Sequence, residues 1–550
     1  MRDHWATQHF DTPTYFQVLS GHGASLRHWA AYGFGLGSPQ RISISGLGTR
    51  LLALKPGDPT QAQDMARGKF TFAGATVNGR PVDVFDAAPP SPLWATALHN
   101  LSWLQHFVTG GHELHRIVAR SLILKWGGQR SGFRTSMVCF QALIALASAA
   151  HFLLGPAPSA FGNQFFELVE KLIHRILAMR PSTLGENFWQ AVALQYASLA
   201  FRGSETLRDQ ANVRLCTVMD QVILPDGGHV SRNPQALLEV LLAVIPIRDA
   251  MMAKREAVPQ ALSATIERMF PMLRMLSHGD RGLGNFQGAG ATEMAGIKTL
   301  VERDTIAGRP LFCAPHSGYC RLSHRSSLLI MDTGIPAECN SPLAIEFSDG
   351  PHRIFSNCGM PGSATDDWRR AAADIAAHNT VEIASFESGV KNSSAAEVIT
   401  SPHGSLINST NEISGRPGKV SHQRSVFLSQ TGSDLRGEDR IASPSTPSGQ
   451  LDFTIRFHLH PGVKATLGRK ETRIAIMLPN KTAWQFNARG GIMALEDSVF
   501  LGDALGPRKT QQIVIRGSTV TASPVNWALR RLEKSAATPD DRVEMPQLPF

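Results

Sequence analysis

The hydrophobic pattern changes its period near Arg303, and this change constrains the fold of the 550-residue chain more than any other feature. Between roughly Pro92 and His278, apolar residues recur every three or four positions, in stretches such as FFELVEKLIHRILAM and FWQAVALQYASLAF. That spacing places apolar side chains on one face of an α-helix. After Arg303, short segments such as LDFTIRFHLHPGV and QQIVIRGSTVTA alternate with turn residues, which predicts strands. The sequence therefore predicts a helical half followed by an all-β half.

These patterns, with the composition of the two ends, divide the chain into four segments. Residues 1–90 form a mixed N-terminal segment rich in Gly and Pro. Residues 91–302 are expected to form antiparallel helical hairpins stacked into a toroid or a solenoid. Residues 303–532 are expected to form an antiparallel β-sandwich, and 533–550 form a polar, proline-containing tail. The fold class is therefore a multidomain α+β chain.

The composition is that of a globular and basic protein. Hydrophobic residues make up 43% of the chain and charged residues 18%, which excludes a wholly disordered chain, a collagen and a coiled-coil rod. The 54 Lys and Arg exceed the 45 Asp and Glu, giving a net charge of +9. This balance favours acidic partners: nucleic acid, an anionic membrane surface or an acidic polysaccharide. Basic clusters interleaved with aromatic residues are missing from the sequence, so we expect no nucleic acid.

The cysteines and the apolar runs bear on compartment. Six cysteines without a CxxC pair indicate reduced or buried thiols rather than a disulfide scaffold. The first residues, MRDHWATQHFDTPTYF, have no apolar core of a signal peptide, so the sequence leaves export open. The longest apolar run, Met137 to Leu154, is interrupted by Gln141 and His151 and predicts a buried core helix. We therefore expect no integral membrane segment; the oligomeric state is left open.

The most informative stretch is ILPDGGHVSRNPQALLEVLLAVIPIRDA, from Ile223 to Ala250. A helix end is followed by a Gly-rich turn that presents His229, Arg232 and Asn233 just before Pro234 opens the next helix. This pattern predicts a group of polar side chains at one rim of the helical half.

Further motifs occur in a fixed order after this stretch. They are GDRGLGNFQGAGAT (Gly279 to Thr292), APHSGYCRL (Ala314 to Leu322), LAIEFSDGPHRIFSNCG (Leu343 to Gly359) and DWRRAAADIAAHNTVEI (Asp367 to Ile383). Together the motifs resemble the bacterial heparinase II/III-like proteins, particularly an alphaproteobacterial branch, over roughly Trp94 to Gly517. The resemblance implies an N-terminal (α/α) toroid, a C-terminal antiparallel β-sandwich, and a polysaccharide lyase that cleaves uronic-acid-containing chains by β-elimination.

That reaction makes three chemical demands. The substrate carboxylate must be neutralised or hydrogen-bonded, a base must remove the proton at C5 of the uronate, and an acid must protonate the leaving oxygen. His229 and Tyr319 are the candidates for base and acid. Asn187, Arg232 and Arg369 are the candidates for binding the carboxylate.

The chain departs from the lyases at several positions to which the resemblance assigns a role. Asn187 matches the first member of their Asn-His pair, but Phe188 stands in place of the His. Ala236 stands where a catalytic Tyr is found. In CNSPLAIEF, Cys339 and Ser341 replace a catalytic His and a metal-binding Asp. The resemblance therefore implies the fold more firmly than the chemistry.

The metal site of the lyases is also altered. Asn357 replaces a second Asp, and His378 matches the third ligand. Because one His with neutral oxygens is a poor zinc site, we expect no metal and no cofactor. His378 is then a substrate-cleft or structural histidine. Trp189 stacks on a sugar ring or packs in the core, and Asn233 joins Arg232 as a substrate-binding candidate.

The resemblance to the lyases and the departures from it lead to two candidate functions. The first is a polysaccharide lyase acting on an anionic, uronic-acid-containing bacterial polysaccharide. The alternative is a catalytically degenerate protein with the same fold that binds carbohydrate or assists envelope polysaccharide assembly. The resemblance implies the cell envelope or periplasm, whereas the missing signal peptide leaves the cytoplasm open.

Overall fold

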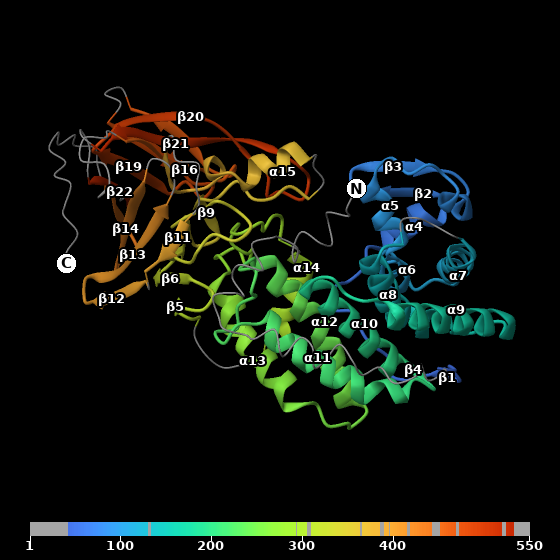
Figure 1. Cartoon of the computed structure of the whole chain (residues 1–550). Helices are drawn as coiled ribbons and strands as arrows, with labels where there is room; N and C mark the ends of the chain where they lie inside the picture. The colour runs from blue at the N-terminus through green and yellow to red at the C-terminus, as the bar shows by residue number, and fades with distance from the viewer. Residues whose placement is uncertain are drawn as a thin grey trace. The chain divides into compact units, whose positions relative to one another are not determined.

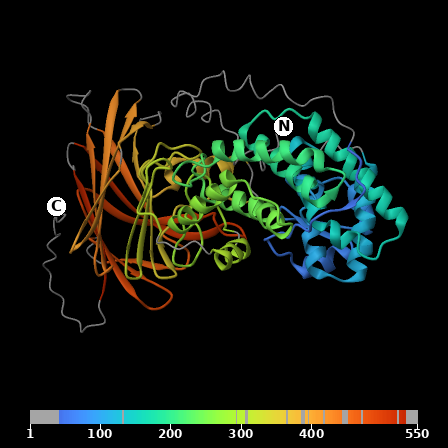
Figure 2. The ribbon, with the colours of Figure 1, turned by 90° about the horizontal axis from the view of Figure 1, so that it is seen from below.

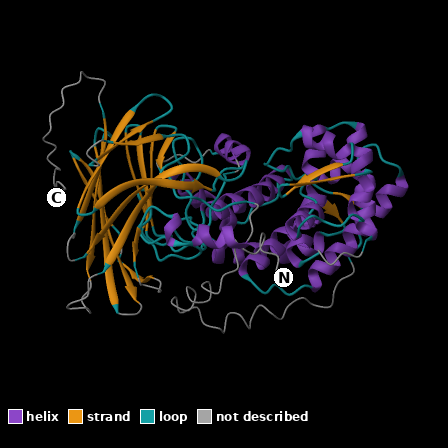
Figure 3. Ribbon diagram, turned by 90° about the horizontal axis from the view of Figure 1, so that it is seen from above, coloured by secondary structure: helices purple, strands orange, loops and turns teal. Residues whose placement is uncertain are grey.

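The computed structural model describes residues 42–129, 134–292, 294–304, 310–362, 366–384, 390–394, 396–414, 418–442, 451–468, 472–519 and 524–532. The chain divides into two compact units. The first comprises the described parts of Met1–Leu224, Leu238–Met269 and Ala295–Thr305. The second comprises those of Pro225–Leu237, Phe270–Met294 and Ile306–Phe550. Figure 3 shows helices in the first unit and long strands in the second.

Helices make up most of the first unit. They are α4 (Pro59–Ala66), η1 (Pro81–Phe85), α5 (Pro92–His99), α6 (Leu104–Gly110), α7 (Glu113–Gly128), α8 (Ser136–Leu153), α9 (Ser159–Ala178), α10 (Leu184–Ala200), η2 (Glu205–Leu207), α11 (Arg208–Val222), α12 (Pro234–Ala253), α13 (Gln260–Met275) and α14 (Met294–Arg303). The first turn of α12 and the last turn of α13 lie in the second unit. Within this unit, α10 packs against both α8 and α11 (Figure 1).

Two short sheets accompany these helices. Strands β2 (Lys69–Phe72) and β3 (Ala75–Asn78) form an antiparallel hairpin within KFTFAGATVNG. Strands β1 (Gly46–Leu47) and β4 (Phe201–Arg202) pair with each other.

Helix α8 is the apolar run that the sequence predicts as a core helix. Its N-cap Thr135 accepts a hydrogen bond from Val138 N, and Leu143 and Leu146 are fully buried. Among the described residues, α8 is the one helix that is long and apolar enough to cross a membrane, and 61% of its residues are buried within the fold. This burial is typical of the core helix of a globular unit.

The second unit is built from antiparallel strands. They are β5 (Cys313–Ala314), β6 (Tyr319–His324), β7 (Ser327–Asp332), β8 (Ile345–Asp349), β9 (His352–Phe355), β10 (Val381–Ile383), β11 (Val390–Ser393), β12 (Glu397–Ser401), β13 (Gly404–Ser414), β14 (Lys419–Ser429), β15 (Asp434–Ala442), β16 (Asp452–His458), β17 (Lys464–Leu467), β18 (Arg473–Met477), β19 (Ala483–Arg489), β20 (Ile492–Phe500), β21 (Arg508–Ser518) and β22 (Val525–Arg531). Helix α15 (Asp366–Ala373) and η3 (Ile375–Ala377) connect β9 to β10.

These strands form three sheets. Five strands run in the order β5-β6-β7-β8-β9, and four in the order β10-β16-β21-β20. The nine-stranded sheet runs β11-β13-β14-β15-β22-β19-β18-β17, with β12 paired to β13. Figure 2 shows the yellow-green strands of the five-stranded sheet beside the orange strands of the nine-stranded sheet.

One apolar core joins all three sheets. It includes Phe347 of β8, Phe457 of β16, and Phe486 and Trp527 of the nine-stranded sheet. The rings of Phe457 and Trp527 lie 4.9 Å apart between centroids, and those of Phe486 and Trp527 lie 6.3 Å apart. Inward-facing aromatic residues from facing sheets are how a β-sandwich buries its surface.

The predicted fold class is confirmed: a helical (α/α) toroid region precedes an antiparallel β-sandwich. The compact units nevertheless interleave in the sequence, because segments 225–237 and 270–294 pack with the strands. The boundaries proposed at 90, 302 and 532 stay predictions. The predicted polar tail, 533–550, lies outside the described residues.

Candidate functional site

The turn that precedes α12 is fixed against the β5–β6 hairpin by Asp226. Its Oδ1 accepts a hydrogen bond from Gly228 N at 3.1 Å, and its Oδ2 accepts one from Ser317 N at 2.7 Å. Ser317 Oγ also donates to Oδ1 at 2.5 Å. A Cβ on Gly228 would lie 1.9 Å from Ser317 Oγ, so this close approach requires glycine. The Gly-rich motif therefore packs directly on the hairpin.

Arg232 follows in this turn with a left-handed backbone, at φ 62°. Its Nε donates to Ser317 O at 2.7 Å, and its other nitrogens donate to Gly318 O, Ile335 O and the Asp332 carboxylate. Burial lowers the pKa of Arg232, but the Asp332 carboxylate outweighs it and the pKa lies above its ordinary value. The guanidinium is thus committed to a buried ion pair and to backbone carbonyls.

Tyr319 packs beside the ion pair of Arg232 and Asp332. Its hydroxyl donates to Arg232 O at 2.6 Å, and its ring is 1% exposed. The ring packs edge-on against Phe286 at 5.6 Å and lies 5.2 Å from the Arg232 guanidinium carbon. Burial, with the nearby Asp332 carboxylate, raises the pKa of Tyr319 well above its ordinary value. The phenol is therefore a buried hydrogen-bond donor.

Gln287 connects the ion pair to the segment that follows β7. Its Nε2 donates to Asp332 Oδ2 at 2.7 Å and to Ser341 Oγ at 2.9 Å. Its Oε1 accepts from Ala337 N at 2.9 Å and from Glu338 N at 3.1 Å. Sequence reasoning missed both Gln287 and Asp332; the motif NFQGAG, which contains Gln287, was the available signal.

His229 and Asn233 lie in the same turn as Arg232. His229 Nδ1 accepts a hydrogen bond from Ser231 N at 3.1 Å and lies 2.8 Å from Ser231 Oγ. Because Nδ1 is an acceptor, the neutral imidazole carries its proton on Nε2. Asn233 Oδ1 accepts from Gln235 N at 2.8 Å, which caps the first turn of α12.

The structure places Asn187 and Trp189 in the first unit, on α10. The N-cap of α10 is Thr183, so Asn187 lies one turn inside the helix. Asn187 Oδ1 accepts from Arg214 of α11, from Nη2 at 2.8 Å and Nε at 3.2 Å. Trp189 is half-buried and meets Phe188 edge-on at 5.2 Å. Arg214 is a cation beside the matched Asn that sequence reasoning missed.

Arg369 lies on α15, and His378 directly follows η3. Both side chains are buried, whereas Trp368 and Arg370 beside them are exposed. Burial lowers the pKa of His378 to about 4, so its imidazole is neutral around pH 7. On α15, Trp368 and Arg370 are therefore the exposed aromatic and basic side chains, whereas Arg369, the predicted substrate ligand, is buried.

The positions at which the chain departs from the lyases are packed in the interior. Phe188 and Ala236 are fully buried, and Cys339 is 4% exposed. Ser341 accepts from Gln287, and Asn357 Oδ1 accepts from Asn379 N at 2.8 Å. Within the described ranges, no three His, Cys, Asp or Glu side chains are grouped so as to hold a metal ion.

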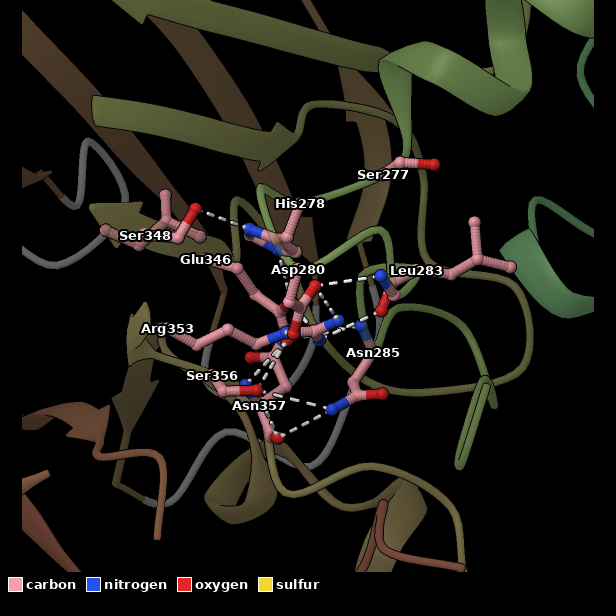
Figure 4. A network of polar contacts seen from close by, with 12 residues as sticks. Ser277, His278, Asp280, Leu283, Asn285, Glu346, Ser348, Arg353, Ser356 and Asn357 are labelled. Carbon is pink, nitrogen blue, oxygen red and sulfur yellow. Dashed lines mark hydrogen bonds and ion pairs between the residues drawn. The ribbon is translucent and has the colours of Figure 1, made fainter. Parts of the chain in front are cut away.

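A second polar network lies within the β-sandwich unit (Figure 4). His278 Nε2 lies 2.9 Å from Glu346 Oε2, and Nδ1 lies 3.0 Å from Ser348 Oγ. Burial and the nearby Arg353 lower the pKa of His278. The neutral ring therefore donates from Nε2 to the carboxylate and accepts the Ser348 hydroxyl at Nδ1.

The same network explains two of the motifs. Glu346 Oε1 accepts from Asn285 N at 3.2 Å and Asn357 N at 2.8 Å, and Arg353 Nε donates to Asp280 at 2.9 Å. Asp280 and Asn285 come from GDRGLGNFQGAGAT, and the others from LAIEFSDGPHRIFSNCG. These two motifs therefore hold each other inside one unit as a buried polar network.

A helical toroid followed by an antiparallel β-sandwich is the architecture of a class of polysaccharide lyases. The structure is similar to heparinase III, with a TM-score of 0.70 at 12% identity over 97% of this chain and 94% of that chain. It is also similar to a mutant of the heparan sulfate lyase HepC from Pedobacter heparinus, with a TM-score of 0.63 at 14% identity over 89% and 87% of the two chains.

Sequence comparison gives a family match for the C-terminal part of the chain. Residues 306–534 match the family model described as "Heparinase II/III-like, C-terminal". FtsZ-localized protein C of Caulobacter vibrioides is 28% identical, over 92% of this chain and 94% of the relative. Residues 306–534 therefore belong to the heparinase II/III-like family, as the motifs imply.

Proposed function

We propose that this protein binds an acidic, uronate-containing polysaccharide without cleaving it. The observation that carries the proposal is the state of the two proton carriers, His229 and Tyr319. β-Elimination needs a basic lone pair to accept the C5 proton. His229 Nδ1 already accepts from Ser231 N, and the Tyr319 hydroxyl donates to Arg232 O. In this arrangement His229 carries its proton on Nε2 and Tyr319 donates its own proton to Arg232 O. Neither side chain is therefore placed as the base.

The candidate carboxylate ligands support the same proposal. The Arg232 guanidinium is engaged by Asp332 and by backbone carbonyls, and Arg369 is 7% exposed. Arg232 thus positions the turn and the hairpin. A ligand carboxylate is better matched by Arg214, a half-buried cation beside Asn187. The excess of basic residues is consistent with an acidic polymer.

β-Elimination by His229 and Tyr319 is the second candidate function. Its support is the family match of residues 306–534 and the likeness to heparinase III along nearly the whole chain. For catalysis, the His229–Ser231 and Tyr319–Arg232 hydrogen bonds would have to open when substrate binds. The two functions therefore differ in whether bound polymer is converted into unsaturated product.

We propose the division site as the place of action. The support is the Caulobacter vibrioides relative, which is named for its localisation with FtsZ. A fluorescent fusion expressed from the native locus tests this. A band at mid-cell is expected, and uniform fluorescence throughout dividing cells contradicts it.

Affinity electrophoresis through gels containing uronate polymers tests binding. We expect retardation of the wild type, and Arg214→Ala weakens binding about tenfold because it removes one charge-assisted contact. Arg202→Ala removes the same charge from an exposed residue of β4 and is the matched control. Equal mobility of the wild type in gels with and without every polymer overturns the proposal, and equal losses in the two variants remove Arg214 from it.

A further inference from the structure

Two cysteines face each other across the β5–β6 hairpin. Cys313 of β5 is in register with Cys320 of β6, and their Sγ atoms lie 2.9 Å apart. Both are free thiols in the structure. The pair lies outside the groups to which the proposed function assigns a role.

The backbone geometry suits a covalent bond between them. Arg321 N donates to Phe312 O at 2.8 Å, which makes that neighbouring pair the hydrogen-bonded one. Because pairs alternate along an antiparallel ladder, Cys313 and Cys320 form a non-hydrogen-bonded pair with Cα atoms about 4.5 Å apart. Disulfides join residues whose Cα atoms lie about 4.4–6.8 Å apart. Little backbone movement is therefore needed.

The two thiols differ in accessibility and acidity. Cys313 is half-buried, whereas Cys320 is fully buried. The hydrogen bond from Cys320 lowers the pKa of Cys313 to about 7, and the pKa of Cys320 is raised by that same contact and by burial. Cys313 is thus the thiol that solvent-borne reagents reach and the one that ionises first.

We propose that Cys313 and Cys320 form a reversible thiol–disulfide site that is oxidised by small-molecule disulfides of the glutathione type. The Cys313 thiolate attacks one sulfur of the oxidant, whose S–S bond breaks and releases one thiolate. The Cys320 sulfur then attacks Cys313 Sγ, an Sγ–Sγ bond forms, and the second thiolate leaves. The two protein thiols lose two electrons and two protons, and the oxidant becomes two thiols.

The position of this site gives the disulfide a structural consequence. Between the two cysteines the chain turns through Ser317 and Gly318, whose carbonyls accept hydrogen bonds from Arg232. Tyr319 precedes Cys320 and holds Arg232 O. Oxidation therefore closes the base of the hairpin that supports the turn before α12.

Thiol mapping on the full-length protein tests the proposal. The protein is equilibrated in buffers of reduced and oxidised glutathione, quenched with a maleimide and digested, and the peptides are identified by mass spectrometry. In oxidising buffer, the wild type is expected to yield a Cys313–Cys320 cross-linked peptide that dithiothreitol removes. Cys320→Ser is expected to stop at a mixed disulfide of glutathione with Cys313.

Cys216→Ser is the matched control, since Cys216 is a half-buried thiol on α11 in the first unit. This variant is expected to retain the cross-link at wild-type yield. Wild-type protein in which Cys313 stays glutathionylated while Cys320 is alkylated would overturn the proposal. So would Cys313 that reacts no faster than Cys216 and gives no cross-link.

Discussion

Arg232 and Asp332 form an ion pair whose side chains are 9% and 1% exposed. The sequence predicts Arg232 as a ligand for a substrate carboxylate, because Arg232 follows a Gly-rich turn at the start of a helix. The structure pairs it with an Asp 100 positions away. Local motifs do not show long-range pairing of this kind, so the sequence singles out Arg232 but misses its partner Asp332 and Gln287, which donates to Asp332.

The first prediction follows from this ion pair. Asp332→Ala leaves the Arg232 guanidinium buried without its counter-charge, and we expect a loss of about 3–5 kcal/mol in the free energy of unfolding. Urea titration followed by circular dichroism measures it. Asp367→Ala, which breaks the exposed pair with Arg370, is the control and should change stability by about 0.5 kcal/mol or less. Similar values for both variants would contradict the assigned burial.

His378 provides a second prediction at this scale. Burial lowers its pKa to about 4 from an ordinary value of 6.5, so the unfolded chain binds more protons between these values. Stability therefore falls as pH drops from about 6.5 to 4, by up to about 1.4 kcal/mol per pH unit from this group. Melting temperatures across this range should show a shallower slope in His378→Gln than in His403→Gln, which alters an exposed histidine. Identical slopes would exclude this role for His378.

At the scale of elements, the period of the hydrophobic residues predicts the helices and strands better than it predicts function. The apolar run from Met137 to Leu154 is α8, and the alternating segments after Arg303 are strands of the three sheets. These depend on local side-chain spacing, which the sequence displays directly. The docking of the turn before α12 on the β5–β6 hairpin depends on contacts across 91 positions, such as Asp226 with Ser317. No local pattern encodes that contact.

Gly228→Ala tests this docking. The added Cβ would lie 1.9 Å from Ser317 Oγ, so we expect a loss of about 1–3 kcal/mol in unfolding free energy. Gly79→Ala is the control, because its Cβ meets no atom within 4 Å. Combining Gly228→Ala with Ser317→Gly removes the clashing side chain and should make the two changes non-additive. Strict additivity in thermal or urea unfolding would place the turn and the hairpin apart.

At the scale of the whole molecule, fold and chemistry separate. The family match of residues 306–534 and the likeness to heparinase III concern the architecture. The motifs that carry the resemblance form buried networks such as that of Asn285 and Glu346. A motif can therefore identify a fold because it holds the fold together. Two of the positions that the resemblance assigns to chemistry, Phe188 and Ala236, hold apolar side chains packed in the interior.

The most direct test of non-cleaving binding is the absorbance of unsaturated uronate product. Purified protein is incubated with each uronate polymer that retards it in affinity electrophoresis, alongside His229→Ala and an active polysaccharide lyase. We predict retention of the polymer with no rise in absorbance for the wild type, while the active lyase gives a clear rise. Sustained product formation by the wild type that His229→Ala abolishes would contradict the account and establish β-elimination instead.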